Sequence, residues 1–264
     1  MDMKGKCAIV TGSSAGVGEA TALLLAQRGA SVLINCTRSV EAAESVAARC
    51  RAAGADAFVV SANVADDADC RRMADAAMAR WGRIDYLVNN AGTTKFVAAN
   101  RLDGLSAQDF HDIYSVNTIG VFQMVRACES ALRASGGAVV NVSSIAGQEG
   151  QGSCIAYAAS KGALNTLTVS LARVLGPQAR VNAVLPGFIE TGWLQSGLGD
   201  AYEASRQAYK DSAALGEVLT PQDIADSIVW LLSATKVTGQ LLRVDGGRQV
   251  GRLQGRPAPR AERA

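Results

Sequence analysis

The chain has 264 residues, of which 48% are hydrophobic and 19% are charged, and its formal net charge is +2. A composition in this range is typical of a folded globular protein, and it excludes disordered and fibrous classes. The single histidine, His111, excludes metal centres and acid–base sites that need two or three imidazoles. We expect His111 to be a structural or surface residue, and the sequence predicts no metal site.

The cysteine pattern and the hydropathy indicate where the protein works. The two closest of the six cysteines, Cys36 and Cys50, are 14 residues apart, so the Cys-x-x-Cys spacing of metal knuckles and redox dithiols does not occur. No stretch approaches the roughly 18 to 20 apolar residues of a membrane span, and Cys7–Val10 is too short for the core of a secretion signal. We therefore expect a cytoplasmic protein with reduced thiols and no membrane partner.

Positive charge is concentrated at the C-terminal end of the chain. Residues 248–264 carry five arginines against one glutamate, a local charge of +4, which leaves −2 for residues 1–247. Residues 251–264 lack hydrophobic periodicity and contain two prolines, so we expect a flexible basic tail. Basic tails without aromatic residues are usually solvated, and we predict no nucleic-acid partner.

Short β-branched runs alternate along the chain with longer Ala-rich stretches of helical spacing, which is the pattern of repeated βα units. In chain order, the predicted strands are Cys7–Thr11, Ser31–Asn35, Ala57–Ser61, Ile84–Val88, Ala138–Val142, Val181–Leu185 and Leu241–Val244. The helices predicted between them are Gly18–Arg28, Glu41–Ala53, Asp67–Trp81, Ala107–Ala134, Tyr157–Leu175 and Gln222–Leu232. The fold class that follows is α/β: a single-domain Rossmann fold over residues 1–250, with a doubly wound seven-stranded parallel sheet and helices on both faces.

Residues 188–216 interrupt this alternation. They show no strand pattern and mix aromatic and aliphatic residues, among them Trp193 and Leu198, with several glycines. A segment this long inside a compact domain is usually a lid or a binding loop. We expect a substrate-covering excursion with one or two short helices, and an insertion that serves oligomer contacts is the alternative.

A glycine-rich turn follows the first strand and opens the first helix. Glycines there let the backbone turn sharply and approach a pyrophosphate, while the free N–H groups of the helix face the anion. Their spacing is G-x-x-x-G-x-G rather than G-x-G-x-x-G. The residues of this turn that we predict to bind a dinucleotide are Gly12, Ser14, Gly16, Val17 and Gly18.

That spacing, together with later motifs in the same order, resembles the short-chain dehydrogenase/reductase family, and the resemblance covers about residues 4–247. The motifs are Asn89-Asn90-Ala91-Gly92, Asn117, Ser143-Ser144, Tyr157-Ala158-Ala159-Ser160-Lys161, and Pro186-Gly187 with Thr191 four residues on. The resemblance implies a ketoreductase-like member that moves a hydride between a nicotinamide and a carbonyl or secondary alcohol. It also implies further cofactor contacts from Asn90, Ala91, Gly92, Tyr157, Lys161, Pro186, Gly187 and Thr191.

The side chains of the proposed catalytic residues also have the chemistry that proton transfer to a carbonyl oxygen needs. Tyr157 and Lys161 are i, i+4 on a helix and share one face, so we expect the ammonium to pull the tyrosine pKa down toward the operating pH. Ser144 lies at the carboxyl end of a strand, where its hydroxyl can hold a substrate oxygen. The resemblance implies that Tyr157 exchanges the proton, that Lys161 also holds the nicotinamide ribose, and that Asn117 supports a water linking Lys161 to solvent.

The end of the second strand decides between the two dinucleotides. An acidic residue is usual there in NAD enzymes, but the chain has Thr37 and Arg38, which suit a 2′-phosphate, so we predict NADP(H). NAD(H) is the alternative, because Ala15 stands where many NADP(H)-dependent relatives carry a basic residue. We expect Asn63 and Val64 to lie against the adenine, where relatives usually have Asp-Val.

The substrate is predicted only as a small carbonyl or alcohol compound, with 3-oxoacyl groups among the options. We expect its walls to come from residues 93–104, Ala146–Ile155 and 188–216, with a polar side from Gln148, Glu149 and Gln151. Residues 93–109 have no net positive charge to bind an acidic carrier protein, since Lys95 and Arg101 are offset by Asp103 and Asp109. A non-catalytic dinucleotide sensor and an oligomeric scaffold are competing hypotheses. The resemblance implies a homotetramer formed through the helices at 107–134 and 157–175.

Overall fold

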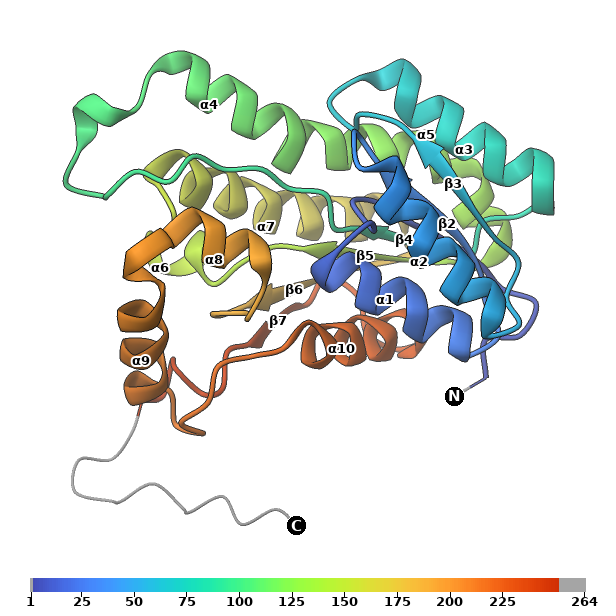
Figure 1. The fold of residues 1–264 in the computed structure, drawn as a ribbon. Coiled ribbons are helices and arrows are strands. Elements are labelled where there is room, and N and C mark those ends of the chain that lie inside the picture. Colours follow the sequence, from blue (N-terminus) through green and yellow to red (C-terminus); the bar gives the residue numbers. More distant parts are fainter. Residues whose placement is uncertain (1, 252–264) are drawn as a thin grey trace, which may run out of the picture.

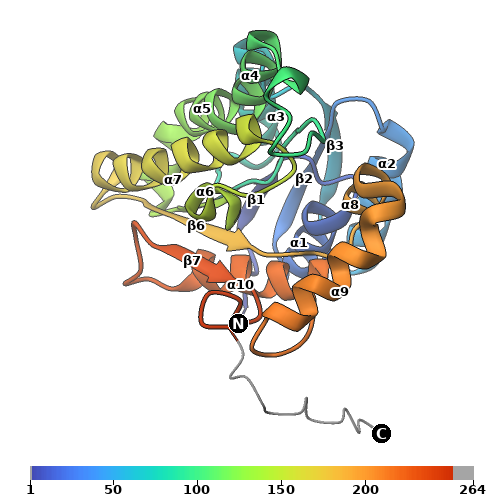
Figure 2. The same ribbon diagram turned by 90° about the vertical axis from the view of Figure 1, so that its left-hand side faces the viewer.

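A computed structural model of the protein describes residues 2–251 and contains one parallel sheet with helices on both faces (Figures 1 and 2). Residues 252–264, which make up nearly all of the predicted basic tail, lie outside the described residues. Within residues 2–251, no helix is both long enough and apolar enough to cross a membrane.

The sheet has seven strands in the order β3-β2-β1-β4-β5-β6-β7, and every neighbouring pair is parallel. The strands are β1 Cys7–Val10, β2 Ser31–Cys36, β3 Ala57–Ser61, β4 Tyr86–Asn89, β5 Ala138–Val142, β6 Arg180–Pro186 and β7 Leu241–Val244. This doubly wound order confirms the predicted fold class. The chain changes winding direction between β1 and β4, where open α/β sheets bind their ligands beyond the carboxyl ends of the strands.

Alternate residues of each strand enter two separate cores. Ala8 and Val10 pack with the helices of one face, and Ile9 between them packs with those of the other. All five residues of β5 are buried, as expected for a strand covered on both sides. One face is covered by α1 Gly16–Gln27, α2 Val40–Ala52 and α10 Pro221–Ser233, and the other by α3 Asp67–Trp81, α5 Gly120–Ser135 and α7 Ile155–Leu175.

One predicted helix is divided in the structure. The expected helix over Ala107–Ala134 consists of α4 Ala107–Tyr114, a π-helical turn at Ser115–Ile119, and α5. A π-turn inserts one extra residue, so it changes which side chains face the sheet without interrupting the helical path. Asn117 lies in this turn and is fully buried.

The segments that surround the carboxyl edge of the sheet are short helices. Two of them follow β6, α8 Gly192–Leu198 and α9 Tyr202–Ser212, and they confirm the short helices expected within residues 188–216. A third, α6 Ala146–Glu149, follows β5 and was not predicted. Figure 1 shows α6, α8 and α9 together at one end of the sheet.

Candidate active site

The glycine-rich turn after β1 has a backbone that only glycine can adopt. Gly12 has φ +61°, and a Cβ there would lie 2.9 Å from the Cα of Ala91. A Cβ on Gly18 would lie 2.4 Å from the carbonyl oxygen of Gly12. The first residue before α1, Ala15, offers no side-chain cap, so the first N–H groups of the helix stay available to an anion. The turn therefore has the shape and the donors that a pyrophosphate needs.

Polar side chains from neighbouring strands hold this turn in place. The Thr11 hydroxyl accepts hydrogen bonds from the main-chain N–H groups of Asn90 and Ala91, each at 3.0 Å. The Asn90 amide donates to the carbonyl oxygens of Thr11 and Gly12, each at 2.9 Å. Asn90, which was predicted to bind the cofactor, therefore donates both hydrogen bonds of its side-chain amide to the glycine-rich turn and supports the shape of that turn.

Asn35 has a similar supporting role, which the sequence analysis missed. Its side-chain oxygen accepts from the Gly12 N–H at 3.0 Å, and its amide donates to the carbonyls of Val60 and Ala62. Asn35 is only 2% exposed. A buried amide in an otherwise apolar strand is the signal that could have identified it, because such a group must find partners.

Tyr157 and Lys161 lie side by side on α7, as their spacing predicts. The Lys161 side chain is buried, and its Nζ lies 5.6 Å from the centroid of the Tyr157 ring. Nζ donates a hydrogen bond to the main-chain oxygen of Val142 at 2.9 Å, at the end of β5. The helix begins just before this pair, where the Cys154 sulfur accepts from the Tyr157 N–H.

Ser144 lies near the Tyr157 phenol, and its hydroxyl acts to lower the pKa of Tyr157. The Ser144 Oγ accepts from the N–H of Ala146 at 3.1 Å. The next segment, α6, packs on α7 so closely that a Cβ on Gly147 would lie 2.5 Å from the carbonyl carbon of Lys161. Ser144 and Tyr157 therefore belong to two segments, the end of β5 and α7, whose connection through α6 is tightly fitted.

The expected direction of the Tyr157 pKa shift is wrong. Burial raises the pKa of Tyr157 to about 12, although the hydrogen bond from Ser144 acts in the opposite direction. Burial also lowers the pKa of Lys161 to about 8. Loss of hydration disfavours the charged form of both groups, and this cost exceeds the attraction that the i, i+4 spacing led us to expect.

Asn117 links three segments around this pair. Its side-chain oxygen accepts from the Thr93 N–H at 2.8 Å, and its amide donates to the Thr93 carbonyl and the Ser160 hydroxyl, each at 3.0 Å. The π-turn thereby fixes the loop after β4 against α7. Gly92 lies at the centre of this arrangement, since a Cβ there would lie 3.5 Å from the Asn117 oxygen and 3.8 Å from Lys161 Nζ.

The residues predicted for the adenosine end surround the carboxyl ends of β2 and β3. Arg38 is exposed, and its guanidinium has no hydrogen-bond or ion-pair partner among residues 2–251. The neighbouring Thr37 hydroxyl donates to the Ala62 carbonyl at 3.4 Å. The Asn63 side chain accepts from the Ala65 N–H at 3.1 Å, and Val64 is buried. An unpaired arginine at the end of β2 fits a phosphate at that place.

The segment after β6 brings the last predicted cofactor residues to the glycine-rich turn. Pro186 ends β6, and a Cβ on the following Gly187 would lie 1.7 Å from the Tyr209 hydroxyl. Thr191 caps α8 by accepting from the Leu194 N–H, and its methyl group lies 3.7 Å from where a Cβ on Gly16 would stand. The structure thus brings the end of β6 next to the turn after β1.

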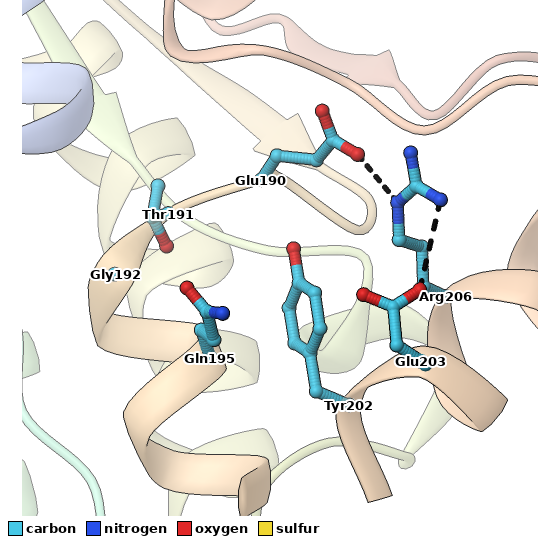
Figure 3. Close-up of a pocket in the computed structure, with 7 residues that line it drawn as sticks. All are labelled: Glu190, Thr191, Gly192, Gln195, Tyr202, Glu203 and Arg206. Atoms are coloured by element: carbon cyan, nitrogen blue, oxygen red, sulfur yellow. Dashed lines mark hydrogen bonds and ion pairs between the residues drawn. The ribbon is translucent and has the colours of Figure 1, made fainter.

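Beside Thr191 there is a polar pocket of about 430 Å³ between α8 and α9 (Figure 3). The Arg206 guanidinium forms an ion pair with Glu190 at 2.5 Å and a longer one with Glu203 at 3.8 Å. The remaining lining residues are Thr191, Gly192, Gln195 and Tyr202. Its charged groups are paired with one another.

Two of the three residues expected to give the substrate site a polar side are engaged by β7. The side chains of Gln148 and Glu149, expected to give a polar side, are bound by Arg243 of β7, at 3.0 and 2.7 Å. The aromatic residue of α8 nearest the reacting group is Trp193, whose ring centroid lies 6.5 Å from that of Tyr157. The excursion over residues 188–216 therefore does reach Tyr157.

Comparisons with known proteins agree with this geometry. A family model described as enoyl-(acyl carrier protein) reductase matches residues 12–249. The "Granaticin polyketide synthase putative ketoacyl reductase 2" of Streptomyces violaceoruber is 43% identical over 241 residues, which are 91% of this chain and 94% of the relative. The 3-oxoacyl-(acyl-carrier-protein) reductase FabG of Staphylococcus aureus is 37% identical over 92% of this chain and 97% of its own.

Solved structures agree as well. A short-chain dehydrogenase/reductase from Burkholderia xenovorans, titled "putative", superimposes with a TM-score of 0.87 at 42% identity, over 95% of this chain and all of that one. An NAD+-bound xylitol dehydrogenase superimposes with a TM-score of 0.86 at 28% identity, over 94% of this chain and 100% of that one. The chain belongs to the short-chain dehydrogenase/reductase family.

Proposed function

We propose that the protein is an NADP(H)-dependent oxidoreductase that reduces a ketone to a secondary alcohol, with 3-oxoacyl compounds as the leading substrate type. The observation that carries the proposal is the position of Tyr157 beside the buried Lys161 ammonium, 5.6 Å from the ring centroid, with the Ser144 hydroxyl near enough to act on the phenol. This group of residues stands at the carboxyl edge of the sheet, next to a turn shaped for a pyrophosphate.

In the proposed mechanism, this chain's residues bind the carbonyl oxygen and supply its proton. Ser144 donates a hydrogen bond to that oxygen, and Tyr157 transfers its phenolic proton to it. When bound, the nicotinamide supplies the hydride to the carbonyl carbon. Lys161 then stabilises the phenolate that remains, and a proton from solvent restores the phenol. Asn117, in the π-turn, holds the loop after β4 and α7 together through its hydrogen bonds with Thr93 and Ser160.

NADP(H) is the proposed cofactor because Arg38, just after β2, offers an exposed guanidinium that has no partner within residues 2–251. Thr37 and Arg38 would hold the 2′-phosphate, and Asn63 and Val64 would lie against the adenine. The uncapped start of α1 and its glycines, with Ser14 and Val17, would hold the pyrophosphate. NAD(H) is the second candidate, supported by Ala15 in the turn and by the NAD+-bound structural relative.

The names of the relatives from Streptomyces violaceoruber and Staphylococcus aureus support a 3-oxoacyl substrate. A carrier protein is a weaker candidate than a small thioester, because the basic residues near the loop after β4 are already paired. Lys95 bonds to Asp109 at 3.0 Å, and Arg101 bonds to Asp103 at 3.0 Å. An acidic partner would find little free positive charge there.

The test is turnover by the purified protein with acetoacetyl thioesters and simple ketones, followed by loss of NADPH or NADH absorbance. We expect reduction with NADPH, and at least about tenfold higher kcat/KM with NADPH than with NADH. A protein that binds NADPH but reduces none of these compounds would instead support the sensor hypothesis. A protein that reduces none of these compounds, and whose oligomer a bound dinucleotide merely stabilises, would support the scaffold hypothesis.

We also propose a homotetramer. Large apolar side chains are exposed along α4, the π-turn and α5, and they include Phe110, Ile119 and Phe122 at 36%, 50% and 42% exposure. On α7, Val174 is 62% exposed. Apolar faces of this kind favour association between copies. Light scattering should give four times the chain mass, and a stable monomer would contradict the proposal.

The proposed location is the cytoplasm. All six cysteines are free and buried, so none is engaged in a disulfide that an oxidising compartment would favour. Cell fractionation of the source organism with an antibody to the protein would test this, and recovery with exported proteins would contradict it.

A further inference from the structure

We propose that the substrate carries an aromatic ring close to its reacting carbonyl group, so that the physiological ketone is an aryl or polycyclic aromatic ketone. This inference rests on the proposed function, because it needs the carbonyl oxygen to lie at Tyr157. It is carried by three rings, Phe96, Tyr157 and Trp193, which we call the aromatic panel.

The rings of the panel come from three separate segments. Phe96 follows β4, Tyr157 lies on α7 and Trp193 lies on α8. The centroids of Phe96 and Trp193 are 5.7 Å apart with an interplanar angle of 60°, and those of Tyr157 and Trp193 are 6.5 Å apart with an angle of 49°. Both distances lie within the range of favourable aromatic pairs.

Trp193 is incompletely covered in spite of these two neighbours, with 51% of its surface exposed. A large apolar surface left open beside a reacting group is a typical feature of a ligand site. A substrate whose carbonyl oxygen accepts from the Tyr157 hydroxyl can extend toward Trp193, because the centroids of the two rings are 6.5 Å apart. An aromatic ring of the substrate at that place would form a further favourable ring pair with Trp193.

Close packing and hydrogen bonds hold the Phe96 ring and its segment in place. A Cβ on Gly197 would lie 2.0 Å from Cε2 and Cζ of Phe96, so α8 and the Phe96 ring fit closely. The Phe96 segment is tied to the loop before α7 by the Val97 N–H, which donates to the Ser153 carbonyl at 2.8 Å. The Thr94 and Ser153 hydroxyls bond at 2.6 Å. Rings that are positioned before binding recognise a rigid, flat ligand at a low entropic cost.

Two of the three polar residues expected at the substrate site are engaged within the protein. Gln148 and Glu149, on the segment after Ser144, are bound by Arg243. The panel therefore selects by ring contact rather than by charge, which favours an uncharged aromatic group over an acidic or sugar-like one.

The test compares acetophenone with cyclohexyl methyl ketone, which differ in whether the ring is aromatic. The readout is the ratio of their kcat/KM values in wild type and variants, because the ratio removes the intrinsic reactivity of each ketone from the comparison between proteins. We expect Trp193→Leu to lower the ratio about tenfold, and Trp193→Phe to restore most of it. Gly197→Ala, which displaces Phe96, should change the ratio in the same direction as Trp193→Leu.

The matched control is Trp230→Leu. Trp230 is 49% exposed like Trp193, but it lies on α10, and no ring contact joins it to the panel among residues 2–251. This substitution should leave the ratio unchanged. A ratio that stays within twofold of wild type in Trp193→Leu would overturn the inference.

Failure of the proposed function would have a different signature, since wild type would then reduce neither ketone. In that case calorimetric binding of the two ketones to NADPH-saturated wild type and Trp193→Leu decides on the panel. Weaker binding of acetophenone alone in the variant would support the panel, and equal losses or no loss would overturn it.

Discussion

Lys161 follows Tyr157 by one helical turn on α7, and its Nζ lies 5.6 Å from the centroid of the tyrosine ring. The same nitrogen donates to the main-chain oxygen of Val142 at 2.9 Å. The lysine is therefore buried beside the group proposed to give up a proton, with a carbonyl rather than a carboxylate as its hydrogen-bond partner. This relationship has consequences for both the pH dependence and the stability of the protein.

Ketone reduction should slow as the pH rises through about 8. Burial raises the pKa of Tyr157 to about 12, so the phenol keeps its proton throughout the neutral range. Burial lowers the pKa of Lys161 to about 8, so above that pH the ammonium that stabilises the phenolate is lost. A profile of kcat/KM against pH should be flat below about 7 and decline above about 8.

The control for this profile is Lys161→Arg, because a guanidinium stays charged over the whole range. The variant's own activity should show no decline near pH 8, whatever its absolute level. A decline at the same pH in wild type and variant would assign the titration to another group.

Replacing the buried lysine should stabilise the fold while it removes activity. The folded-state pKa of Lys161 is about 8, below its ordinary value of 10.5, so the unfolded chain binds the proton more readily. The resulting destabilisation is complete below pH 8 and disappears as the pH rises to about 10.5. We expect Lys161→Met to raise the free energy of unfolding by on the order of 1–3 kcal/mol at pH 7, and by less at pH 10.

Denaturant unfolding at the two pH values measures this difference. Thr166→Val on the exposed side of the same helix serves as the comparison, since it should show no pH-dependent change. A Lys161→Met protein that is less stable than wild type at pH 7 would show that the Val142 hydrogen bond outweighs the cost of burying the charge.

Reversal of charge at the end of β2 should change the cofactor preference. An aspartate at position 38 would repel a 2′-phosphate and accept hydrogen bonds from a ribose. We expect Arg38→Asp to weaken NADPH binding about 100-fold and to shift the preference toward NADH, as measured by titration of each dinucleotide. Arg173→Asp, at an exposed position near the far end of α7, is the matched control and should change neither affinity. An unaltered preference in Arg38→Asp would show that this residue does not contact the phosphate.

Arg243 should influence catalysis from outside the site. Its guanidinium joins β7 to α6, with bonds of 2.7 Å to Glu149 and 2.7 Å to Asp245, and its side chain is 14% exposed. Because α6 begins two residues after Ser144, loss of this contact should displace the serine hydroxyl. We expect Arg243→Gln to cost about 1–3 kcal/mol of stability, since Glu149 and Asp245 each lose one charged partner, and to lower kcat more than it raises KM.

The comparison for that variant is Arg126→Gln, which breaks the surface pair between Arg126 of α5 and Asp67 of α3. Surface pairs contribute about 0–1 kcal/mol, so it should behave like wild type. Equal kcat values in Arg243→Gln and wild type would show that α6 keeps Ser144 in place without this contact.

The sequence predicted the sheet well because its strands are short, apolar and separated by long helical stretches. Ala57–Ser61, Ala138–Val142 and Leu241–Val244 have the predicted ends, and the other four strands differ by two residues or fewer. The helix predicted over Ala107–Ala134 was wrong in one respect. A π-turn at Ser115–Ile119 shifts the pattern by a single residue, and apolar periodicity is too coarse to reveal it.

The arrangement of the candidate site could be predicted from the sequence only for residues that are close together in the chain, because their spacing on one helix decides whether they meet. The i, i+4 spacing placed Tyr157 and Lys161 together, but it gave the wrong direction for the tyrosine pKa, because burial depends on distant segments. The contacts of Asn35 with Gly12 and of Arg243 with Glu149 join residues far apart in the chain. Such pairs depend on strand order and loop packing, which no local pattern contains.

The most direct test of the central claim is the rate of ketone reduction by Tyr157→Phe at saturating NADPH, measured beside its NADPH affinity. The substitution removes one hydroxyl and keeps the ring that contacts Trp193. The account predicts that kcat falls by at least about 10³-fold, since the acid is lost, while NADPH affinity stays within about threefold of wild type. A variant that reduces ketones at the wild-type rate would contradict the assignment of Tyr157 as the proton donor.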